Sequence, residues 1–157
     1  MKLLSYTLLL FCLVATPAKA AEAYEYNIYE SVGNSSGKGL NDFTMTVGGG
    51  VEMRIKNGFG VETDLAYSFL NRHDDFGIFS VGPFYNFQSA KKVIPFIDGG
   101  YASTFRNDQT NLIYFGGGVD YWPAKKMGLK VAVRNYISTD DPAKFNLTQF
   151  KVGLLFR

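Results

Sequence analysis

The last two extended segments of the chain alternate bulky apolar side chains with small or charged ones. Met127, Leu129, Val131 and Val133 alternate with Gly128, Lys130, Ala132 and Arg134, and Phe150, Val152, Leu154 and Phe156 alternate with Gln149, Lys151, Gly153 and Leu155. Successive side chains of a β-strand point to opposite faces, so both segments predict strands with one apolar face. The side chains on the other face are too small, and glycine is too frequent there, for a good water-facing surface. It fits the crowded interior of a barrel whose apolar side meets lipid.

Residues 1–20 have the pattern of a cleaved signal peptide. Lys2 supplies a positive start, 3–14 is an apolar run too short to span a bilayer, and Ala18 and Ala20 are the small residues that a signal peptidase reads. We expect cleavage after Ala20 and a single barrel domain over 21–157; an N-terminal anchor helix is the alternative. The only cysteine, Cys12, would be removed, which leaves no thiol for a disulfide or a metal.

The charge balance of the exported chain excludes one class of partner. The signal contains two of the sixteen Lys and Arg residues and none of the fourteen Asp and Glu, so the remaining 137 residues are formally neutral. Net charge therefore gives no support for nucleic-acid binding. The sequence points to no cofactor.

Eight segments have strand composition and are bounded by turn residues. They cover roughly 23–32, 42–55, 59–70, 76–87, 93–105, 111–122, 127–137 and 146–156. The connections alternate between short ones (56–58, 88–92 and 123–126) and longer ones rich in Asn, Asp, Ser and Gly (33–41, 71–75, 106–110 and 138–145). In the first short connection, Asn57 and Gly58 both tolerate positive φ, which predicts a tight turn. The pattern predicts an all-β, eight-stranded antiparallel transmembrane up-and-down barrel, with the short turns and both chain ends in the periplasm.

The remaining segments keep the two-face pattern, with some irregularities. Glu30 falls on the apolar face, which we expect only near the outer rim. Pro83 and Pro95 each remove a ladder hydrogen bond, so we expect a bulge or a local distortion at both. Aromatic residues near strand ends predict two interfacial girdles: Tyr24, Phe43, Phe59, Phe69, Phe87, Tyr121, Trp122 and Phe156.

Ten charged residues fall on the inward face. They are Glu25, Glu52, Glu62, Asp64, Asp98 and Asp120, with Arg54, Lys130, Arg134 and Lys151. An eight-stranded barrel has an interior just wide enough for side chains, and isolated buried charges are costly. We therefore expect an internal ion-pair network that fills the barrel. A narrow conducting path is the alternative, but the bulky inward residues Tyr29, Phe84, Phe96 and Tyr114 favour blockage.

Catalytic and metal-binding patterns are weak. His73 is the only histidine; with Asp74 and Ser68 or Ser80 it could form a hydrolase site at the membrane boundary, but a solvated loop histidine is the simpler interpretation. The pairs Asp74-Asp75 and Asp140-Asp141 could bind calcium, although adjacent aspartates more often form a solvated turn. Cations in the longer loops could meet lipopolysaccharide phosphates: Lys38, Arg72, Arg106 and Lys144.

The signal, the eight alternating segments and two repeated sequence motifs are shared with a known protein family. Gly48–Glu52 and Gly116–Asp120 both read Gly-Gly-Gly-Val-acid, and the final segment is Phe-Lys-Val-Gly-Leu-Leu-Phe-Arg. Over 21–157 the chain resembles the small OmpA/OmpX-like outer-membrane β-barrels of Gram-negative bacteria. The resemblance implies that the assembly machinery recognises the last strand through Phe150, Gly153 and Phe156, with Arg157 following as a departure from the common terminal phenylalanine. That family includes adhesins, structural barrels, narrow channels and a few lipid enzymes, so the resemblance does not decide between these functions.

These observations predict a monomeric, non-enzymatic outer-membrane barrel with a plugged interior. Its partners would be outer-membrane lipid, lipopolysaccharide, the barrel-assembly machinery and a surface ligand held by the loops. Three alternatives stay open: a narrow channel, a lipid A-modifying hydrolase, and a soluble lipocalin-like periplasmic barrel with the apolar face turned inward.

Overall fold

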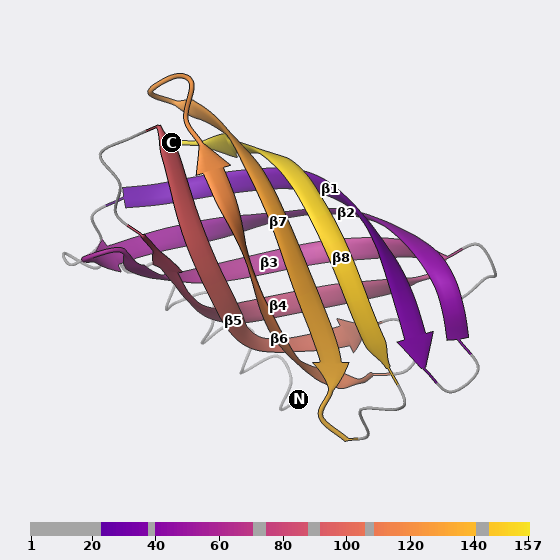
Figure 1. The fold of residues 1–157 in the computed structure, drawn as a ribbon. Helices are drawn as coiled ribbons and strands as arrows, with labels where there is room; N and C mark the ends of the chain where they lie inside the picture. The colour runs from indigo at the N-terminus through magenta and orange to yellow at the C-terminus, as the bar shows by residue number, and fades with distance from the viewer. Residues whose placement is uncertain (1–22, 38–39, 71–74, 88–91, 106–108, 141–144) are drawn as a thin grey trace, which may run out of the picture.

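Eight antiparallel strands close into a barrel, in which each strand pairs with its sequence neighbours and β8 pairs with β1 (Figure 1). The structure is a computed structural model that describes residues 23–37, 40–70, 75–87, 92–105, 109–140 and 145–157. The strands are β1 (Ala23–Gly37), β2 (Leu40–Lys56), β3 (Phe59–Leu70), β4 (Phe76–Asn86), β5 (Val93–Phe105), β6 (Asn111–Tyr121), β7 (Met127–Ser138) and β8 (Asn146–Phe156). The described ranges contain no helix long and apolar enough to cross a membrane. The predicted fold class is confirmed.

The largest departure from the predicted strand bounds is at the first hairpin. The β1–β2 ladder continues through Asn34↔Phe43 to Gly37↔Leu40, where the sequence predicts a loop over 33–41. Asn, Ser and Gly have low strand propensity, but this segment of β1 also pairs with β8, as at Ser36↔Asn146. Backbone pairing on both sides therefore overrides the local preference.

The turn between β2 and β3 has the predicted conformation. Asn57 has a φ of 54° and Gly58 a φ of 86°, both in the left-handed region. A register shift between Arg54 and Lys56 directly precedes this turn. A residue with a bulky or branched side chain at position 58 would be strained there, because a Cβ would also lie 2.3 Å from the Asn86 carbonyl oxygen.

The two strand prolines behave differently. The β4–β5 ladder is interrupted between Val81↔Tyr101 and Phe84↔Asp98, as expected at Pro83, and it resumes in the same register. Pro95 causes no interruption, because it pairs with Val119 of β6 and its carbonyl accepts from Phe87 N at 2.9 Å. The distortion expected at Pro95 is therefore wrong: its missing N–H faces the end of β4, where the ladder is already ending.

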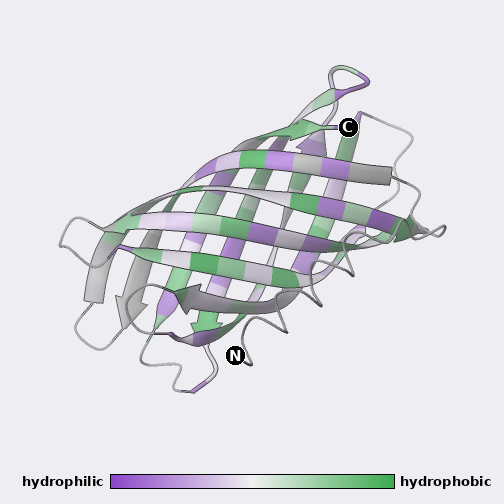
Figure 2. Cartoon of the chain, turned by 180° about the vertical axis from the view of Figure 1, so that it is seen from behind, coloured by the Kyte–Doolittle hydropathy of each residue, from purple (hydrophilic) through white to green (hydrophobic). Residues whose placement is uncertain are grey.

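The outward face of the barrel is apolar and the inward face holds the polar and charged residues. Val131 is 55% exposed and Val152 58%, whereas Lys151 is 3% exposed and Glu25 0%. Colouring by hydropathy shows this alternation along the strands (Figure 2). The lipocalin-like alternative required the opposite orientation and is excluded by this arrangement. Glu30 is exposed on the outward face between Val47 of β2 and Val152 of β8, so apolar residues flank it on both sides.

Inward glycines leave room for large inward side chains. A Cβ on Gly48 would lie 2.6 Å from the Tyr29 ring, and a Cβ on Gly60 would lie 2.3 Å from the Phe84 ring. Close packing of this kind is what an eight-stranded interior requires, since its diameter is fixed by the strand number. The glycine-rich inward face is therefore a consequence of filling the barrel with aromatic rings.

Candidate functional site

The interior is filled in layers along the barrel axis. At the loop end, where β1 joins β2 and β3 joins β4, a buried apolar cluster comes from five strands, β4 to β8: Phe76, Ile78, Ala102, Leu112, Tyr114, Tyr136 and Leu147, with Phe145 packed against it. Beside this cluster, Thr46 lies 2.7 Å from the Ser68 hydroxyl and accepts from Gln149 Nε2 at 2.9 Å. Apolar packing and a small polar network thus occupy the loop end of the interior.

Below this layer lies a central ion cluster, formed by Glu62, Asp64, Asp98, Arg134 and Lys151. Arg134 Nη2 is 2.5 Å from Glu62 Oε1, and Arg134 Nε donates to Asp98 Oδ2 at 2.9 Å. Arg134 Nη1 and Lys151 Nζ lie 3.6 and 3.3 Å from the same Asp64 oxygen. Two tyrosines complete the cluster, with Tyr114 donating to Glu62 at 2.9 Å and Tyr29 donating to Asp64. The three carboxylates share two cations, so the cluster has one excess negative charge when all are ionised.

A second, turn-side ion cluster lies near the short turns and consists of Glu25, Glu52, Arg54, Asp120, Lys130 and Arg157. Lys130 Nζ bridges Glu52 at 2.8 Å and Asp120 at 3.2 Å. Glu25 is held between Arg54 at 3.0 Å and Arg157 at 2.5 Å. Three carboxylates meet three cations, so this cluster is balanced.

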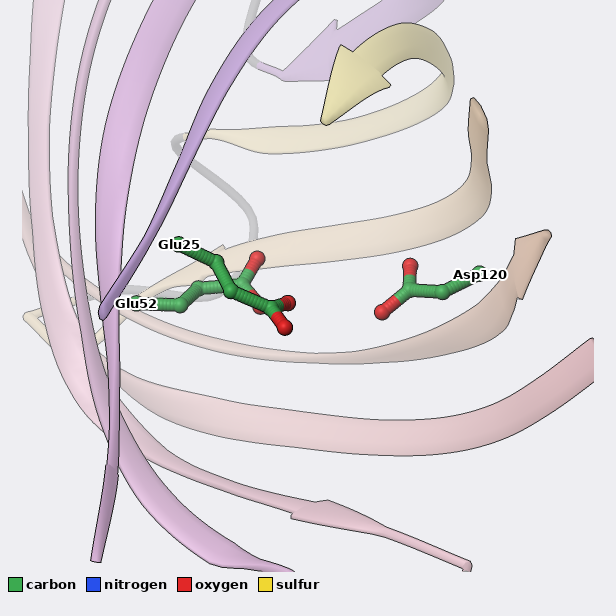
Figure 3. A group of neighbouring side chains, drawn as sticks. All are labelled: Glu25, Glu52 and Asp120. Carbon is green, nitrogen blue, oxygen red and sulfur yellow. The ribbon is translucent and has the colours of Figure 1, made fainter. Parts of the chain in front are cut away.

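Three carboxylates of the turn-side ion cluster lie close enough to suggest a cation site. One oxygen from each of Glu25, Glu52 and Asp120 lies within 4.8 Å of the others, and Asp120 faces the two glutamates across the interior (Figure 3). The Lys130 ammonium already bridges Glu52 and Asp120, and two arginines pair with Glu25. The cluster is thus an ion-pair network that contains its own cations.

Most interior cations also lie over aromatic rings. Lys130 Nζ is 3.8 Å from the Phe96 ring centroid, and Lys151 Nζ is 4.1 Å from that of Tyr29. The Arg134 guanidinium carbon is 4.7 Å from the Tyr114 ring centroid. Cations over ring faces gain further electrostatic stabilisation when they are shielded from water. The aromatic residues therefore fill space and stabilise the ions together.

The structure places all ten sequence-predicted interior charges inward, and each takes part in one of the two ion clusters. In the last strand, Phe150 is exposed outward and Gly153 packs inward against Tyr29, while Phe156 is partly buried. Their role in assembly stays a prediction. Several predicted positions lie outside the described residues: Ala18, Ala20, Lys38, Arg72, His73, Asp74, Arg106, Asp141 and Lys144.

Sequence reasoning missed the role of Arg157 and misplaced Trp122. Trp122 is buried at 6% exposure, so its assignment to an exposed aromatic girdle is wrong, while Phe43, Phe59, Phe69, Phe87 and Tyr121 are exposed. The Arg157 guanidinium carbon lies 3.8 Å from the Trp122 ring centroid. Arg157 follows the outward Phe156, so strand alternation itself indicates that Arg157 points inward.

Comparisons with solved structures identify the architecture. No family model and no curated protein matches the chain. Neisserial surface protein A matches with a TM-score of 0.70 at 14% identity, over 88% of this chain and 99% of that one. Ail of Yersinia pestis, in complex with the heparin analogue sucrose octasulfate, matches with a TM-score of 0.60 at 12% identity, over 85% and 96% of the two chains. The outer-membrane enzyme PagL matches with a TM-score of 0.51 at 14% identity, over 83% and 99%.

The chain has the fold of the small eight-stranded outer-membrane barrels. At these identities the likeness concerns the fold alone, because one such barrel can carry unrelated functions. The neighbours include both an enzyme and a barrel crystallised with a heparin analogue, so they do not decide between catalysis and binding.

Proposed function

We propose that this protein is a monomeric, integral outer-membrane barrel with a filled interior, whose role is structural or depends on contacts made by its four loops outside the cell. The observation that carries the proposal is the apolar outward face on every strand of a closed barrel. Contiguous apolar surface of this extent is unfavourable in water, and the closed ladder leaves no free strand edge for oligomerisation. The exported orientation follows from the predicted signal and from the short turns at one end.

The filled interior supports a structural role over conduction. Ion pairs occupy the turn-side and central layers, and apolar packing occupies part of the loop-end layer. An ion would have to break several buried ion pairs and displace an apolar cluster to pass, and both steps are costly.

The interior also gives no support for the hydrolase alternative. Ser68 and Ser80 point into the barrel and are buried, with 0% and 1% exposure, whereas lipid chains would lie against the outward face. A non-enzymatic role predicts that His73→Ala leaves the acylation pattern of lipid A unchanged in mass spectra. Loss of one acyl chain that depends on His73 would favour the hydrolase.

Within this proposal, the loops are the part of the protein that would bind a surface ligand. Ail has this fold and was crystallised with a polyanion, and the loop sequences here contain Lys38, Arg72, Arg106 and Lys144. Their positive charges would suit phosphates of lipopolysaccharide or sulfated surface polymers.

A pair of single-cysteine variants tests location and orientation together. Thr139→Cys lies at the loop end and Ala124→Cys in the turn between β6 and β7, and both positions are exposed. In intact cells, a membrane-impermeant maleimide should label Thr139→Cys only, and permeabilised cells should label both. The barrel should also require detergent for extraction and shift in gel mobility on boiling. Recovery in the aqueous fraction, or labelling of Ala124→Cys alone, would contradict the proposal.

A further inference from the structure

The two ends of the barrel differ sharply in charge. The described residues of the turn end are 23–24, 56–58, 87, 92, 122–126 and 157; they include five basic side chains and no acidic one, a side-chain charge of +5. The basic residues are Lys56, Lys92, Lys125, Lys126 and Arg157. The described residues of the loop end are 33–37, 40–42, 75, 109–110, 139–140 and 145; they include three aspartates and no basic residue, a side-chain charge of −3. A uniformly basic end attracts anionic partners.

Part of the turn end is a hollow of about 290 Å³ with cationic and apolar walls. It is lined by Lys92, Lys125 and Arg157, and by Trp122, Ile94 and Pro123. Lys92 and Lys125 are exposed. One carboxylate of the turn-side ion cluster, that of Glu25, pairs with Arg157 of the wall. Glu25 is fully buried, so its negative charge is not exposed in the hollow. The accessible charge in the hollow is therefore positive.

The walls of the hollow are fixed by the strands that meet there. Trp122 N donates to the Lys92 carbonyl at 2.8 Å, and Arg157 N donates to the Lys126 carbonyl at 3.1 Å. These bonds join the start of β5, the β6–β7 turn and the end of β8. A site whose walls are tied in this way loses little conformational entropy when a ligand binds.

Arg157 is oriented to serve as an anion contact. Its Nε donates to Glu25 at 2.5 Å, and its guanidinium lies over the Trp122 ring. Within the described part of the chain, its two terminal nitrogens have no hydrogen-bond partner, and its side chain is 35% exposed. Guanidinium groups held in a fixed plane are well suited to phosphate oxygens.

The hollow lies at the rim of the barrel, where the apolar outward face begins. Val93 and Tyr121 pair across β5 and β6 at the ends of these strands, adjoin Lys92 and Trp122 in sequence, point outward, and are 43% and 41% exposed. A ligand bound at this rim can therefore place a charged group between the cations and an apolar part over the rim, beside the outer surface of the barrel. A phospholipid has this division of polarity, whereas free phosphate does not.

We propose that this hollow binds the phosphate headgroup of an anionic phospholipid from the leaflet on the turn side of the barrel. Lys92, Lys125 and Arg157 contact the phosphate, Ile94 and Pro123 contact the glycerol region, and the acyl chains pass over the rim beside Val93 and Tyr121. The identity of that leaflet as the periplasmic one rests on the proposed function. The binding itself depends only on the geometry and charge described above.

Trp122 is the only tryptophan of the chain, so its fluorescence reports directly on the hollow. The folded barrel in a neutral detergent would be titrated with short-chain phosphatidylglycerol, with phosphatidylcholine of the same chain length, and with inorganic phosphate. We expect a saturable change with phosphatidylglycerol only. Lys92→Gln/Lys125→Gln should weaken binding by roughly tenfold to thirtyfold, since each lysine near an anionic surface contributes about fivefold.

Two control variants test whether the loss of binding comes from the lysine charges in the hollow, rather than from misfolding or from the loss of positive charge elsewhere on the protein. Lys92→Arg/Lys125→Arg should retain binding, and Lys144→Gln in the loop-end sequence should not change it. Equal responses to the two lipids, full competition by inorganic phosphate, or unchanged binding in the Gln double variant would each overturn the proposal. Heat-dependent gel mobility of every variant confirms that the barrel is folded. Because the titration uses purified protein, its failure would leave the cellular orientation test unaffected, and the reverse also holds.

Discussion

Arg134 of β7 joins β3 and β5 across the interior, with Nη2 2.5 Å from Glu62 Oε1 and Nε donating to Asp98 Oδ2 at 2.9 Å. Arg134→Met would leave these carboxylates without a cation, with Lys151 close only to Asp64. We expect a loss of about 3–5 kcal/mol in the free energy of unfolding, as for other broken buried pairs. Urea titrations of the barrel in lipid vesicles measure it.

Arg54 provides the matched control for that variant. It is 18% exposed, and its partner Glu25 also pairs with Arg157. Arg54→Met should therefore cost less, about 1 kcal/mol, as for a partly solvated pair. Equal losses for Arg54→Met and Arg134→Met would show that burial in the central ion cluster does not increase the free-energy cost of removing the cation.

Gly48 and Tyr29 should behave as a coupled pair. A Cβ at position 48 would lie 2.6 Å from the Tyr29 ring, so Gly48→Ala should cost about 1–3 kcal/mol through overpacking. In the Tyr29→Ala background the same change should cost less, and a double-mutant cycle in urea gives the coupling energy. Gly99→Ala, where the nearest atom would be 3.2 Å away, is the milder control. Simple additivity of the two substitutions would contradict this packing argument.

Glu30 is expected to reduce stability in a bilayer. It is exposed between Val47 and Val152 on the apolar face. Glu30→Val should raise the free energy of unfolding in vesicles by about 1 kcal/mol, since acidic groups on the lipid face of barrels cost less than the roughly 2–4 kcal/mol of Lys or Arg. The inward Glu52→Val should lower stability, because it removes a partner of Lys130. A loss on Glu30→Val would instead point to a specific partner for this carboxylate.

The filled interior predicts that the barrel does not conduct ions. The wild-type barrel should give no discrete conductance steps in planar bilayers, and Arg134→Ala should give none either, because the apolar cluster at the loop end stays in place. Stepwise currents that change on Arg134→Ala or Glu62→Ala would favour the channel alternative and exclude the plugged interior.

The sequence predicted the arrangement of faces because strand alternation is local and has a strict period of two. Gly128, Lys130 and Arg134 share parity, as do Gln149, Lys151 and Gly153, so one pattern gives both the strand and the side on which charges lie. The turn at Asn57 and Gly58 was predictable for the same reason, since its geometry depends on two adjacent residues.

The pairing of charges was not predictable, because it depends on the relative stagger of strands far apart in sequence. Nothing local indicates that Arg134 meets Glu62 and Asp98 or that Lys130 meets Glu52. The Lys130–Asp120 pair differs, because these residues face each other in the β6–β7 hairpin. The extension of β1 to Gly37 has a similar cause, since pairing with both β2 and β8 outweighs local turn composition. Trp122 was misplaced because aromatic residues suit both a membrane interface and an interior ring stack.

The junction between β1 and β8 joins the first and last parts of the barrel to be synthesised, from Tyr26↔Phe156 to Ser36↔Asn146. Until β8 is present, both edges of the sheet expose unsatisfied peptide groups. A chain truncated before residue 146 would keep seven strands but lack β8, and both of its open edges could then pair with other chains.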